Sequence, residues 1–332
     1  MTSVPEKQGE LWRRLQFIFD SKLHIRLESL VVLIVLCAAM AVLSPYFFSI
    51  SNFLNIFLAT STIGVLAIGA TVILSSNGLD LSLGSVMGFS GIVGAYLVVI
   101  AGLPWPFAII GALAAGSCAG AINGFLITRT RMPAFIVTLG MLGIARGFAL
   151  ILAPNGGAIY GLPAPVVFLG QGRPLGIPSP VIILALTALV VHYMLAYSPF
   201  GRHTLAMGDS EAAARATGIP VERLRWKLYI LSGFMAGLAG LLFMARVNAG
   251  DPTAGINYEL TAITAAIIGG TSLFGGKGSI LGTLVGALIM GVLQNGLNLL
   301  SVPSFWQQVA IGVVLILAVY IDQLQSAKEK KS

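Results

Sequence analysis

Residues 198–227 read SPFGRHTLAMGDSEAAARATGIPVERLRWK and form the longest internal stretch of the chain that can lie in water. This insert holds five of the nineteen lysines and arginines and three of the twelve acidic residues. The rest of the chain is lipid-soluble, since 57% of all residues are apolar, only 9% are charged and the mean hydropathy is +0.93. A soluble domain has about a quarter of its residues charged. The composition therefore predicts an all-α polytopic membrane protein with a polar insert near its middle.

The insert itself contains the pattern of a short helix. Asp209 or Ser210 can accept the free N–H groups of a first turn, and Glu211 suits the positive end of the helix dipole. Gly218 and Pro220 then end this helix, and a second helix can follow. Two interpretations are open on the residues alone: a solvated connector between two spans, or a surface that docks another protein.

Apolar runs long enough to cross a bilayer occur on both sides of the insert. A spanning helix needs about 20 apolar residues. The eighth run is short and rich in glycine, which is compatible with a broken span. The ten candidate spans are 28–47, 53–75, 83–102, 105–127, 134–153, 179–198, 228–247, 259–273, 279–300 and 305–322.

The distribution of positive charge predicts the orientation. An even number of spans places both termini on one side, and lysine and arginine favour the cytoplasmic side. With both termini in the cytoplasm, sixteen of the nineteen basic residues fall on that side, and Arg146, Arg173 and Arg246 remain. The insert is then a cytoplasmic loop between spans six and seven of a protein of the inner, or plasma, membrane.

The same orientation divides the chain into three parts. Residues 1–28 form a cytoplasmic segment, in which 11–17 is amphipathic enough to lie along a membrane surface. Residues 29–322 form the transmembrane domain, which includes the loop 198–227, and 323–332 form a cytoplasmic tail.

Two outer connections are long enough to meet an external partner. The first, 154–178, is rich in proline and glycine and is predicted to be ordered but irregular. The second, 246–259, is acidic and rich in turn residues. The residues predicted to face a docking protein are Arg173, Arg246, Asp251 and Glu259.

Asp80 is the only acidic residue between Glu28 and Asp209. A carboxylate inside a bilayer costs about 2.5 to 3.5 kcal/mol on insertion scales, so it needs a partner, an interface or a function. Either Asp80 or Ser82 caps the third span, or Asp80 belongs to a gate or a transport pathway.

Other polar residues also fall inside apolar runs. Arg146 needs acceptors, for which helix-end carbonyls, Asp80 and a hydroxyl-rich substrate are the alternatives. Asn295 and Asn298 lie one helical turn apart, so they either line a polar path or bind a neighbouring helix. Glycines at four-residue spacing, such as 116/120/124 and 278/282/286, predict close helix packing.

No pattern in the sequence indicates catalysis by this chain. Residues 275–279, GGKGS, differ from a phosphate-binding loop because position 271 is threonine and Gly278 follows the lysine. The two cysteines lie in apolar runs, and the three histidines lie in polar or interfacial positions. We therefore predict a non-enzymatic chain without a cofactor or metal of its own.

Over nearly its whole length the chain resembles the sugar-transporting permeases of ATP-binding-cassette importers, specifically the ribose permease type. Phe274 departs from the family pattern, where a small residue is usual. The motifs that carry the resemblance are NGLDLSLGS at 77–85, similar to the family's GIDLSVGS; GRPLGIP at 172–178; EAA at 211–213 with Gly218 and Ile219; PTAG at 252–255 with 258–260; and GGTSL at 269–273 with GGKG at 275–278.

The resemblance implies the partners of the chain and the roles of its residues. It implies a homodimer enclosing one pathway, a separate cytoplasmic ATPase subunit that binds ATP and Mg²⁺, and a periplasmic or lipid-anchored sugar-binding protein outside, with no nucleic acid. The residues expected to couple to the ATPase are Asp209, Glu211, Ala212, Ala213 and Gly218. Those expected in the pathway or its gate are Asn77, Asp80, Ser82, Arg146, Asn295 and Asn298.

The implied activity is import of a monosaccharide, ribose or a related pentose. Three alternatives stay open: an amino-acid or nucleoside permease of the same superfamily, a channel, and an ion-coupled secondary transporter. A secondary transporter needs a coupling-ion site, for which Asp80 alone is a poor candidate.

Overall fold

A computed structural model describes residues 27–329. The predicted amphipathic segment 11–17 and the basic residues before Leu27 therefore lie outside the part of the chain that the structure describes. The helices in chain order are α2 (Leu27–Leu43), α3 (Ile50–Ser75), α4 (Leu83–Ala95) with the π-helical η2 (Tyr96–Ile100), α5 (Pro106–Thr130), α6 (Ala134–Leu152), η3 (Pro154–Gly156), α7 (Ala164–Gln171), η4 (Pro174–Gly176), α8 (Ser179–Tyr197), α9 (Pro199–Asp209), α10 (Glu211–Ala216), α11 (Val221–Val247), α12 (Tyr258–Ile268), α13 (Ile280–Leu299) and α14 (Ser304–Glu329).

The fold is all-α, as predicted for a polytopic membrane protein. Eight of the described helices are long and apolar enough to cross a bilayer, while α2 and α12 are shorter apolar helices. Each of the ten predicted spans overlaps a helix, and the eighth matches α12, which has only 11 residues. The seventh predicted span starts too late, because α11 begins at Val221 and its first turns are polar and extend beyond the apolar run.

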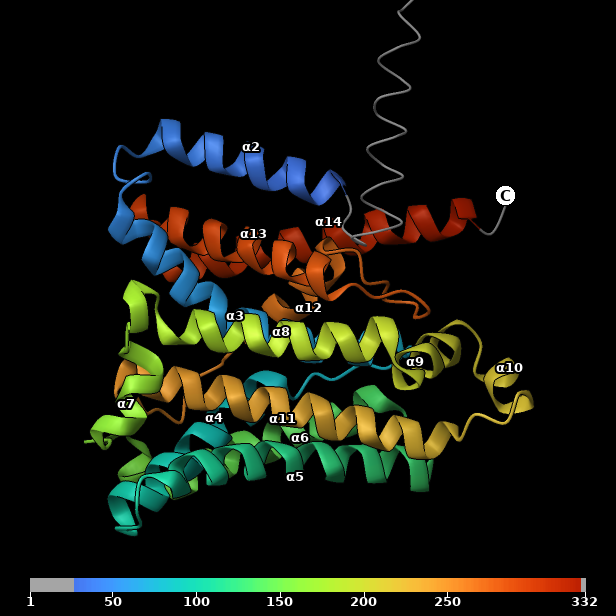
Figure 1. The fold of residues 1–332 in the computed structure, drawn as a ribbon, viewed down its shortest axis with the longest axis horizontal. Coiled ribbons are helices and arrows are strands. Elements are labelled where there is room, and N and C mark those ends of the chain that lie inside the picture. Colours follow the sequence, from blue (N-terminus) through green and yellow to red (C-terminus); the bar gives the residue numbers. More distant parts are fainter. Residues whose placement is uncertain (1–26, 330–332) are drawn as a thin grey trace, which may run out of the picture.

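The long helices run side by side, with α9 and α10 at one end of the bundle and α7 at the other (Figure 1). The start of α2 and the end of α14 lie at the same end as α9 and α10 (Figure 1). This arrangement agrees with the prediction of an even number of crossings. The assignment of that end to the cytoplasm stays a prediction from the charge distribution.

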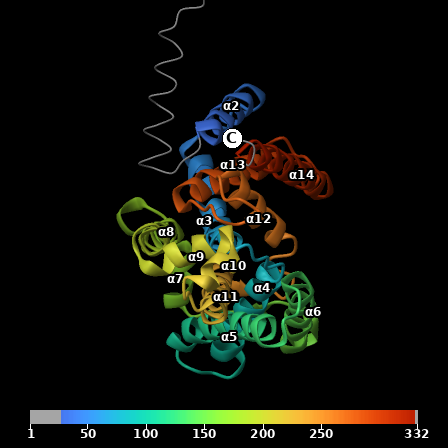
Figure 2. The same ribbon diagram turned by 90° about the vertical axis from the view of Figure 1, so that its right-hand side faces the viewer.

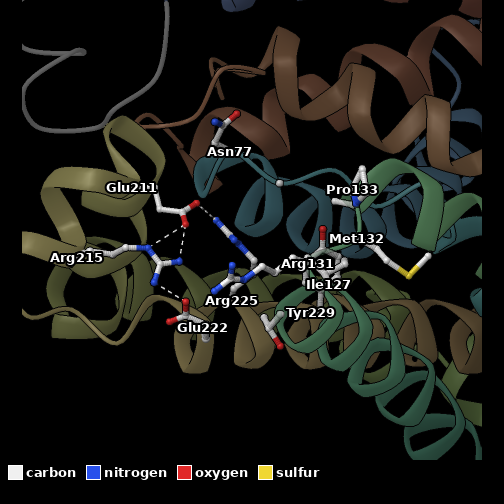
Figure 3. Close-up of a pocket in the computed structure, with 13 residues that line it drawn as sticks. Asn77, Ile127, Arg131, Met132, Pro133, Glu211, Arg215, Glu222, Arg225 and Tyr229 are labelled. Atoms are coloured by element: carbon white, nitrogen blue, oxygen red, sulfur yellow. Dashed lines mark hydrogen bonds and ion pairs between the residues drawn. The ribbon is translucent and has the colours of Figure 1, made fainter.

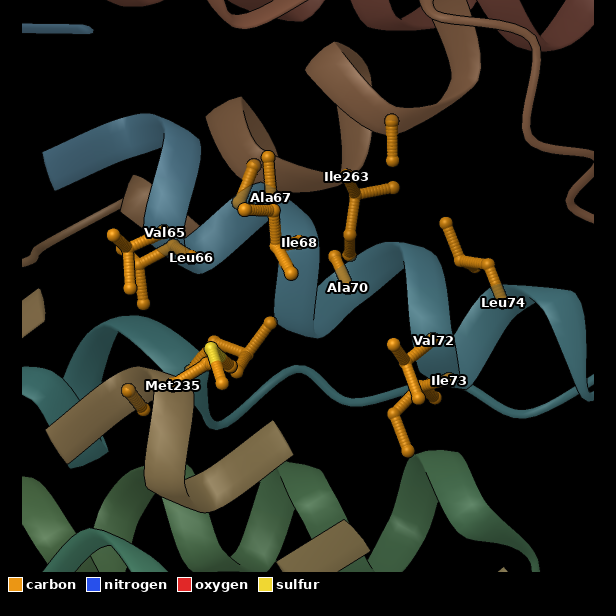
Figure 4. Packing of buried hydrophobic residues seen from close by; sticks show 14 of the residues in the cluster. Val65, Leu66, Ala67, Ile68, Ala70, Val72, Ile73, Leu74, Met235 and Ile263 are labelled. Atoms are coloured by element: carbon orange, nitrogen blue, oxygen red, sulfur yellow. The ribbon is translucent and has the colours of Figure 1, made fainter. Parts of the chain in front are cut away.

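The centre of the bundle is α3. Its most apolar window is 83% buried, against 33% for α5 and 28% for α6. Figure 4 shows side chains of α3 between Met235 of α11 and Ile263 of α12. Viewed end-on, α4 and α12 lie between α6 and α14 (Figure 2). Every residue of α3 from Thr60 to Ser75 is buried, so this part of the helix packs against other elements on all its faces.

Glycines bring α5 and α11 into backbone contact, as their four-residue spacing predicted. A Cβ atom on Gly116 would lie 2.3 Å from the carbonyl oxygen of Gly233, and one on Gly120 would lie 2.1 Å from that of Tyr229. On α13, a Cβ on Gly286 would lie 1.9 Å from the Ala265 carbonyl of α12. Such contacts supply the packing that helices in lipid need.

Two short strands lie at the end of the bundle opposite α10. β1 (Ile159–Tyr160) pairs antiparallel with β2 (Ala249–Gly250), so that Ile159 lies opposite Gly250. With η3 before β1 and with α7 and η4 after it, the 154–178 connection has more regular structure than the predicted irregular loop.

Candidate functional site

The polar insert folds into α9, α10 and the start of α11, so α9 is added to the two helices predicted for 209–218 and for the residues after Pro220. Asp209 is the last residue of α9, and Ser210 adopts an extended backbone that separates α9 from α10. The Ser210 Oγ accepts a hydrogen bond from the Ala213 N–H at 3.3 Å, so Ser210, not Asp209, is the cap. Gly218 has a φ of +83°, which ends the segment where glycine is favoured.

A network of four charged side chains ties α10 to the start of α11 (Figure 3). Glu211 accepts from Arg215 Nη2 at 2.7 Å and from Arg225 Nη2 at 2.5 Å, and Arg215 also pairs with Glu222. Hydrogen bonds from Arg225 first, and then from Arg215, lower the pKa of the Glu211 carboxyl. Exposed ion pairs contribute little singly, so the geometric constraint on α10 matters more than its energy.

The outward face of α10 is open to another protein. Among the residues predicted to couple to an ATPase, Asp209, Ala212, Ala213 and Gly218 are exposed, whereas Ala214 between them is 2% exposed and anchors the helix. Four of the five predicted coupling residues are therefore exposed, and the fifth, Glu211, is half-buried and binds Arg215 and Arg225.

The end of α9 is wedged between two other segments. A Cβ on Gly208 would lie 2.0 Å from the Ser75 carbonyl at the end of α3 and 2.6 Å from the Gly276 nitrogen. The Gly276 N–H donates to that same Ser75 carbonyl at 3.1 Å. Gly275 and Gly276 both have positive φ, which explains the paired glycines of the GGKG stretch. Sequence reasoning missed this junction, although the double glycine was the available signal.

Asp80 is 4% exposed and lies in the segment between α3 and α4. Its carboxylate accepts from the Ser82 N–H at 3.0 Å, the Ser82 Oγ at 2.6 Å and the Ser232 Oγ at 2.9 Å. The Asn123 amide donates to Ser82 Oγ at 3.1 Å, and the Tyr229 hydroxyl to the Leu79 carbonyl at 3.0 Å. These contacts join α11, α5 and the segment after α3.

This geometry supports the structural interpretation of Asp80, while its place in a gate or pathway stays a prediction. Asp80 satisfies the first free N–H before α4, while Ser82 makes no side-chain capping bond. Ser232 and Asn123 were not predicted; Asn123 lies inside an apolar run, and that was the signal available in the sequence. Asn77, with a φ of 58°, forms the turn that precedes this segment.

Arg146 binds backbone carbonyls, which were the first of the three kinds of partner predicted for it. Its Nη1 donates to the Ala254 carbonyl at 2.9 Å and to the Pro252 carbonyl. Its described hydrogen-bond partners do not include Asp80. Arg146 therefore fastens the segment between β2 and α12 to α6.

The first turns of α4 and α12 meet inside the bundle. A Cβ on Gly84 would lie 2.1 Å from Glu259 Oε2 and 2.2 Å from the Gly255 carbonyl, and one on Gly88 would lie 2.6 Å from the Ala254 carbonyl. Met87, on the same helix, packs on Gly240 of α11. Gly240 lies seven residues before the end of α11 at Val247, roughly 10 Å into the bundle at 1.5 Å per residue. The segment 251–257 thus dips inward from the end of the bundle.

The four residues predicted to dock an external protein have different environments in the structure. Arg173 is exposed, and Asp251 is half-buried, with its Oδ1 accepting from the Thr253 N–H at 2.8 Å. Arg246 donates to the Leu58 carbonyl at 3.3 Å. Glu259 is only 7% exposed, so it does not lie on an outer surface as predicted, because the start of α12 is inside the bundle.

Asn295 and Asn298 both make contacts between helices or their connections. Asn295 Nδ2 donates to Asn52 Oδ1 of α3 at 2.8 Å, and Asn298 Oδ1 accepts from Gln307 Nε2 at 2.8 Å. These contacts favour the packing alternative for both asparagines. In the part of the chain that the structure describes, neither asparagine is hydrogen-bonded to Asp80 or to its partners Ser82 and Ser232.

Comparison with known proteins identifies the family to which this sequence is similar. The sequence model of the family described as branched-chain amino acid transport system / permease component matches residues 52–319. The chain is 43% identical over 298 residues to the ribose import permease protein RbsC of Escherichia coli K12, covering 89% of this chain and 92% of that protein.

Two further relatives are similar over most of their length. The ribose import permease protein RbsC of Haemophilus influenzae is 38% identical over 308 residues, which are 92% of this chain and 95% of that protein. The D-allose transport system permease protein AlsC of Escherichia coli K12 is 38% identical over 296 residues, covering 89% and 90%. The chain belongs to the permease family described as the branched-chain amino acid transport system permease component, and it is a multi-pass membrane transport subunit rather than an enzyme.

Proposed function

We propose that the chain is the membrane-spanning permease subunit of an ATP-binding-cassette importer for a monosaccharide, ribose or a related pentose. The observation that carries the proposal is the 43% identity to a ribose import permease over 89% of the chain. The D-allose relative and an L-arabinose permease from Azospirillum brasilense, which is 37% identical over 292 residues, support a sugar as the substrate class.

The proposed importer includes three kinds of partner. A second copy of the chain completes the pathway, and an ATPase subunit that binds ATP and Mg²⁺ docks on the exposed face of α10. A sugar-binding protein delivers the substrate at the end of the bundle where α7 lies, where Arg173 is exposed (Figure 1). Since the sugar arrives on a binding protein, the pathway itself can bind it weakly.

The contacts around α10 support a route for coupling. A displacement of α10 reaches α11 through the Glu211–Arg225 contact, and it reaches the end of α3 through the close approach of Gly208 to Ser75. Both α3 and α11 are largely buried, so they move as rigid elements. An ATPase that contacts α10 differently in its two states then biases two states of the permease.

Such a displacement would act on two segments that connect helices, one after α3 and one after α11. The segment after α3 holds Asp80, which is bonded to Ser232 of α11. The segment after α11 is fastened by Arg146 and meets α4 at Gly84 and Gly88. Segments of this kind, which interrupt helices inside a membrane protein, line substrate pathways in transporters. We therefore assign Asp80, Ser82 and Arg146 to the gate that α3 and α11 move.

Reconstitution of the chain with its ATPase and its binding protein in proteoliposomes tests this proposal. Radiolabelled ribose should accumulate when ATP is enclosed with the ATPase, and unlabelled ribose should compete better than allose, arabinose or xylose. Uptake that continues without the ATPase, or that a proton uncoupler abolishes at constant ATP, would instead indicate a secondary transporter.

The same assay tests a second candidate function, the transport of a branched-chain amino acid. The description of the matching family favours a branched-chain amino acid as substrate. Leucine is therefore included among the competitors. Competition by leucine and not by any sugar would replace the sugar proposal with this one.

A further inference from the structure

A cavity of about 700 Å³ lies behind α10, between the end of α5, the start of α6 and the start of α11 (Figure 3). This volume is within the range of about 300 to 1,000 Å³ that small-molecule sites occupy. Its charged lining consists of three arginines and two glutamates: Arg131, Arg215, Arg225, Glu211 and Glu222. The lining thus carries one more positive than negative charge.

The cations of this cavity are not equally engaged. Arg215 and Arg225 share Glu211, and Arg215 also pairs with Glu222. Arg131 makes no ion pair or side-chain hydrogen bond with any residue in the part of the chain that the structure describes. It occupies the end of α5 in a left-handed conformation, with a φ of 57°, and its exposed side chain lines the cavity.

We propose that this cavity is a binding site for a small phosphate-bearing anion, held by Arg131 and Arg225. A guanidinium binds phosphate oxygens through paired N–H groups, and Arg131 has its full donor set available. Arg225 also lines the cavity and is 22% exposed, and its contact with Glu211 uses Nη2, so its other N–H groups can bind a second acceptor. Asn77 also lines the cavity, and its side-chain amide offers N–H donors to further oxygens, whereas the hydroxyl of Thr128 donates to the Gly124 carbonyl.

In this site the bound anion competes with Glu211 for Arg225. The anion and the Glu211 carboxylate both require Arg225, and like charges repel at close range. Occupancy therefore weakens the contact that ties α10 to α11. The phosphate can belong to a soluble metabolite or to the headgroup of an anionic lipid, since the cavity lies at the polar end of the bundle. The inference does not depend on which substrate is transported.

Titration calorimetry on the full chain in phosphatidylcholine nanodiscs tests the soluble source. The probes are ribose 5-phosphate and inorganic phosphate, with ribose as the uncharged control. Arg131→Gln should weaken ribose 5-phosphate binding at least tenfold. Arg129→Gln is the matched control, because Arg129 lies in the last turn of α5 but does not line the cavity, and it should change binding less than twofold. Glu211→Gln should strengthen binding at least threefold by releasing Arg225.

Native mass spectrometry tests the lipid source. The chain is extracted from nanodiscs that contain phosphatidylglycerol, and the phosphatidylglycerol retained by each variant is counted. Less retention by Arg131→Gln than by Arg129→Gln identifies a headgroup as the anion. The proposal is overturned if Arg131→Gln and Arg129→Gln behave alike toward ribose 5-phosphate, inorganic phosphate and phosphatidylglycerol.

Discussion

Ser232 Oγ donates a hydrogen bond to Asp80 Oδ2 at 2.9 Å and so connects α11 to the segment after α3 across 152 positions of sequence. Two further bonds from Ser82 complete the coordination of the carboxylate, which none of the described basic side chains contacts. A buried carboxylate is tolerated when its oxygens are bonded in this way. Asp80 thus joins α11 to the segment between α3 and α4.

Asp80→Asn should lower both stability and transport. The amide keeps one acceptor oxygen but places an NH₂ group against the Ser232 or Ser82 donors. Hydrogen bonds to a charged group contribute about 1.5 to 3 kcal/mol, so the loss should be a measurable drop in the melting temperature of the detergent-solubilised chain. Ser232→Ala removes one of the three bonds and should cost less. Wild-type melting and wild-type uptake for Asp80→Asn would remove Asp80 from the gate.

Arg146→Gln should loosen the segment between β2 and α12. The shorter amide cannot reach both the Pro252 and the Ala254 carbonyls that Arg146 binds. The measurement is the rate of maleimide labelling of an Ala254→Cys variant, in a background where Cys37 and Cys118 are serine. Ala254 is 8% exposed, and labelling should accelerate at least fivefold when Arg146 is replaced.

Thr253→Cys provides the control for this experiment. Thr253 is already exposed, so its labelling should not depend on Arg146. If Arg146→Gln left the labelling of Ala254→Cys unchanged, Arg146 would not be the residue that holds this segment to α6.

Gly120→Ala should disrupt the contact between α5 and α11. The added Cβ would lie 2.1 Å from the Tyr229 carbonyl, which is backbone and cannot move aside freely. Overpacking of this kind costs about 1 to 3 kcal/mol. Gly312→Ala on α14 is the control, since a Cβ there meets no described atom within 4 Å. Thermal unfolding followed by tryptophan fluorescence compares the two, and equal melting temperatures would contradict the close contact.

The attachment of α10 should withstand mild acid. Hydrogen bonds from Arg225 and Arg215 hold the pKa of the Glu211 carboxyl below its usual value. A group with a depressed folded-state pKa stabilises above the unfolded-state pKa, near 4.3, and the stabilisation is lost as pH falls through the lower folded-state pKa. Hydrogen exchange of residues 210–218, corrected for intrinsic rates, should show equal protection at pH 7.5 and 5.5. A loss of protection over that interval would show that the pKa of the Glu211 carboxyl is raised and not lowered in this network.

Much of the fold could be predicted because membrane helices are marked by composition. The ten apolar runs all became helices, and the short eighth run became the short α12. The residues near the ends of helices were harder to predict. Asp209 and Ser210 are both good caps, and only the extended backbone at Ser210 decides between them.

The candidate site was predictable only in part, because its contacts cross long stretches of sequence. Asp80 and Arg146 stood out as charges in apolar runs, yet their partners Ser232 and Ala254 have no comparable signal. Glu259 was misplaced on the outer surface because nothing in its local sequence shows that 251–257 turns inward. That turn depends on Gly84 and Gly88 of a distant helix, which allow the backbone to approach.

If energy from ATP reaches the transmembrane helices through α10, as proposed, then ribose uptake must depend on this helix. Uptake of ribose and hydrolysis of ATP are recorded in the same proteoliposomes for the wild-type complex and for a variant in which 211–216 is replaced by a glycine–serine linker of equal length. The account predicts that uptake falls to background in the variant while the permease remains folded. Undiminished uptake would contradict it.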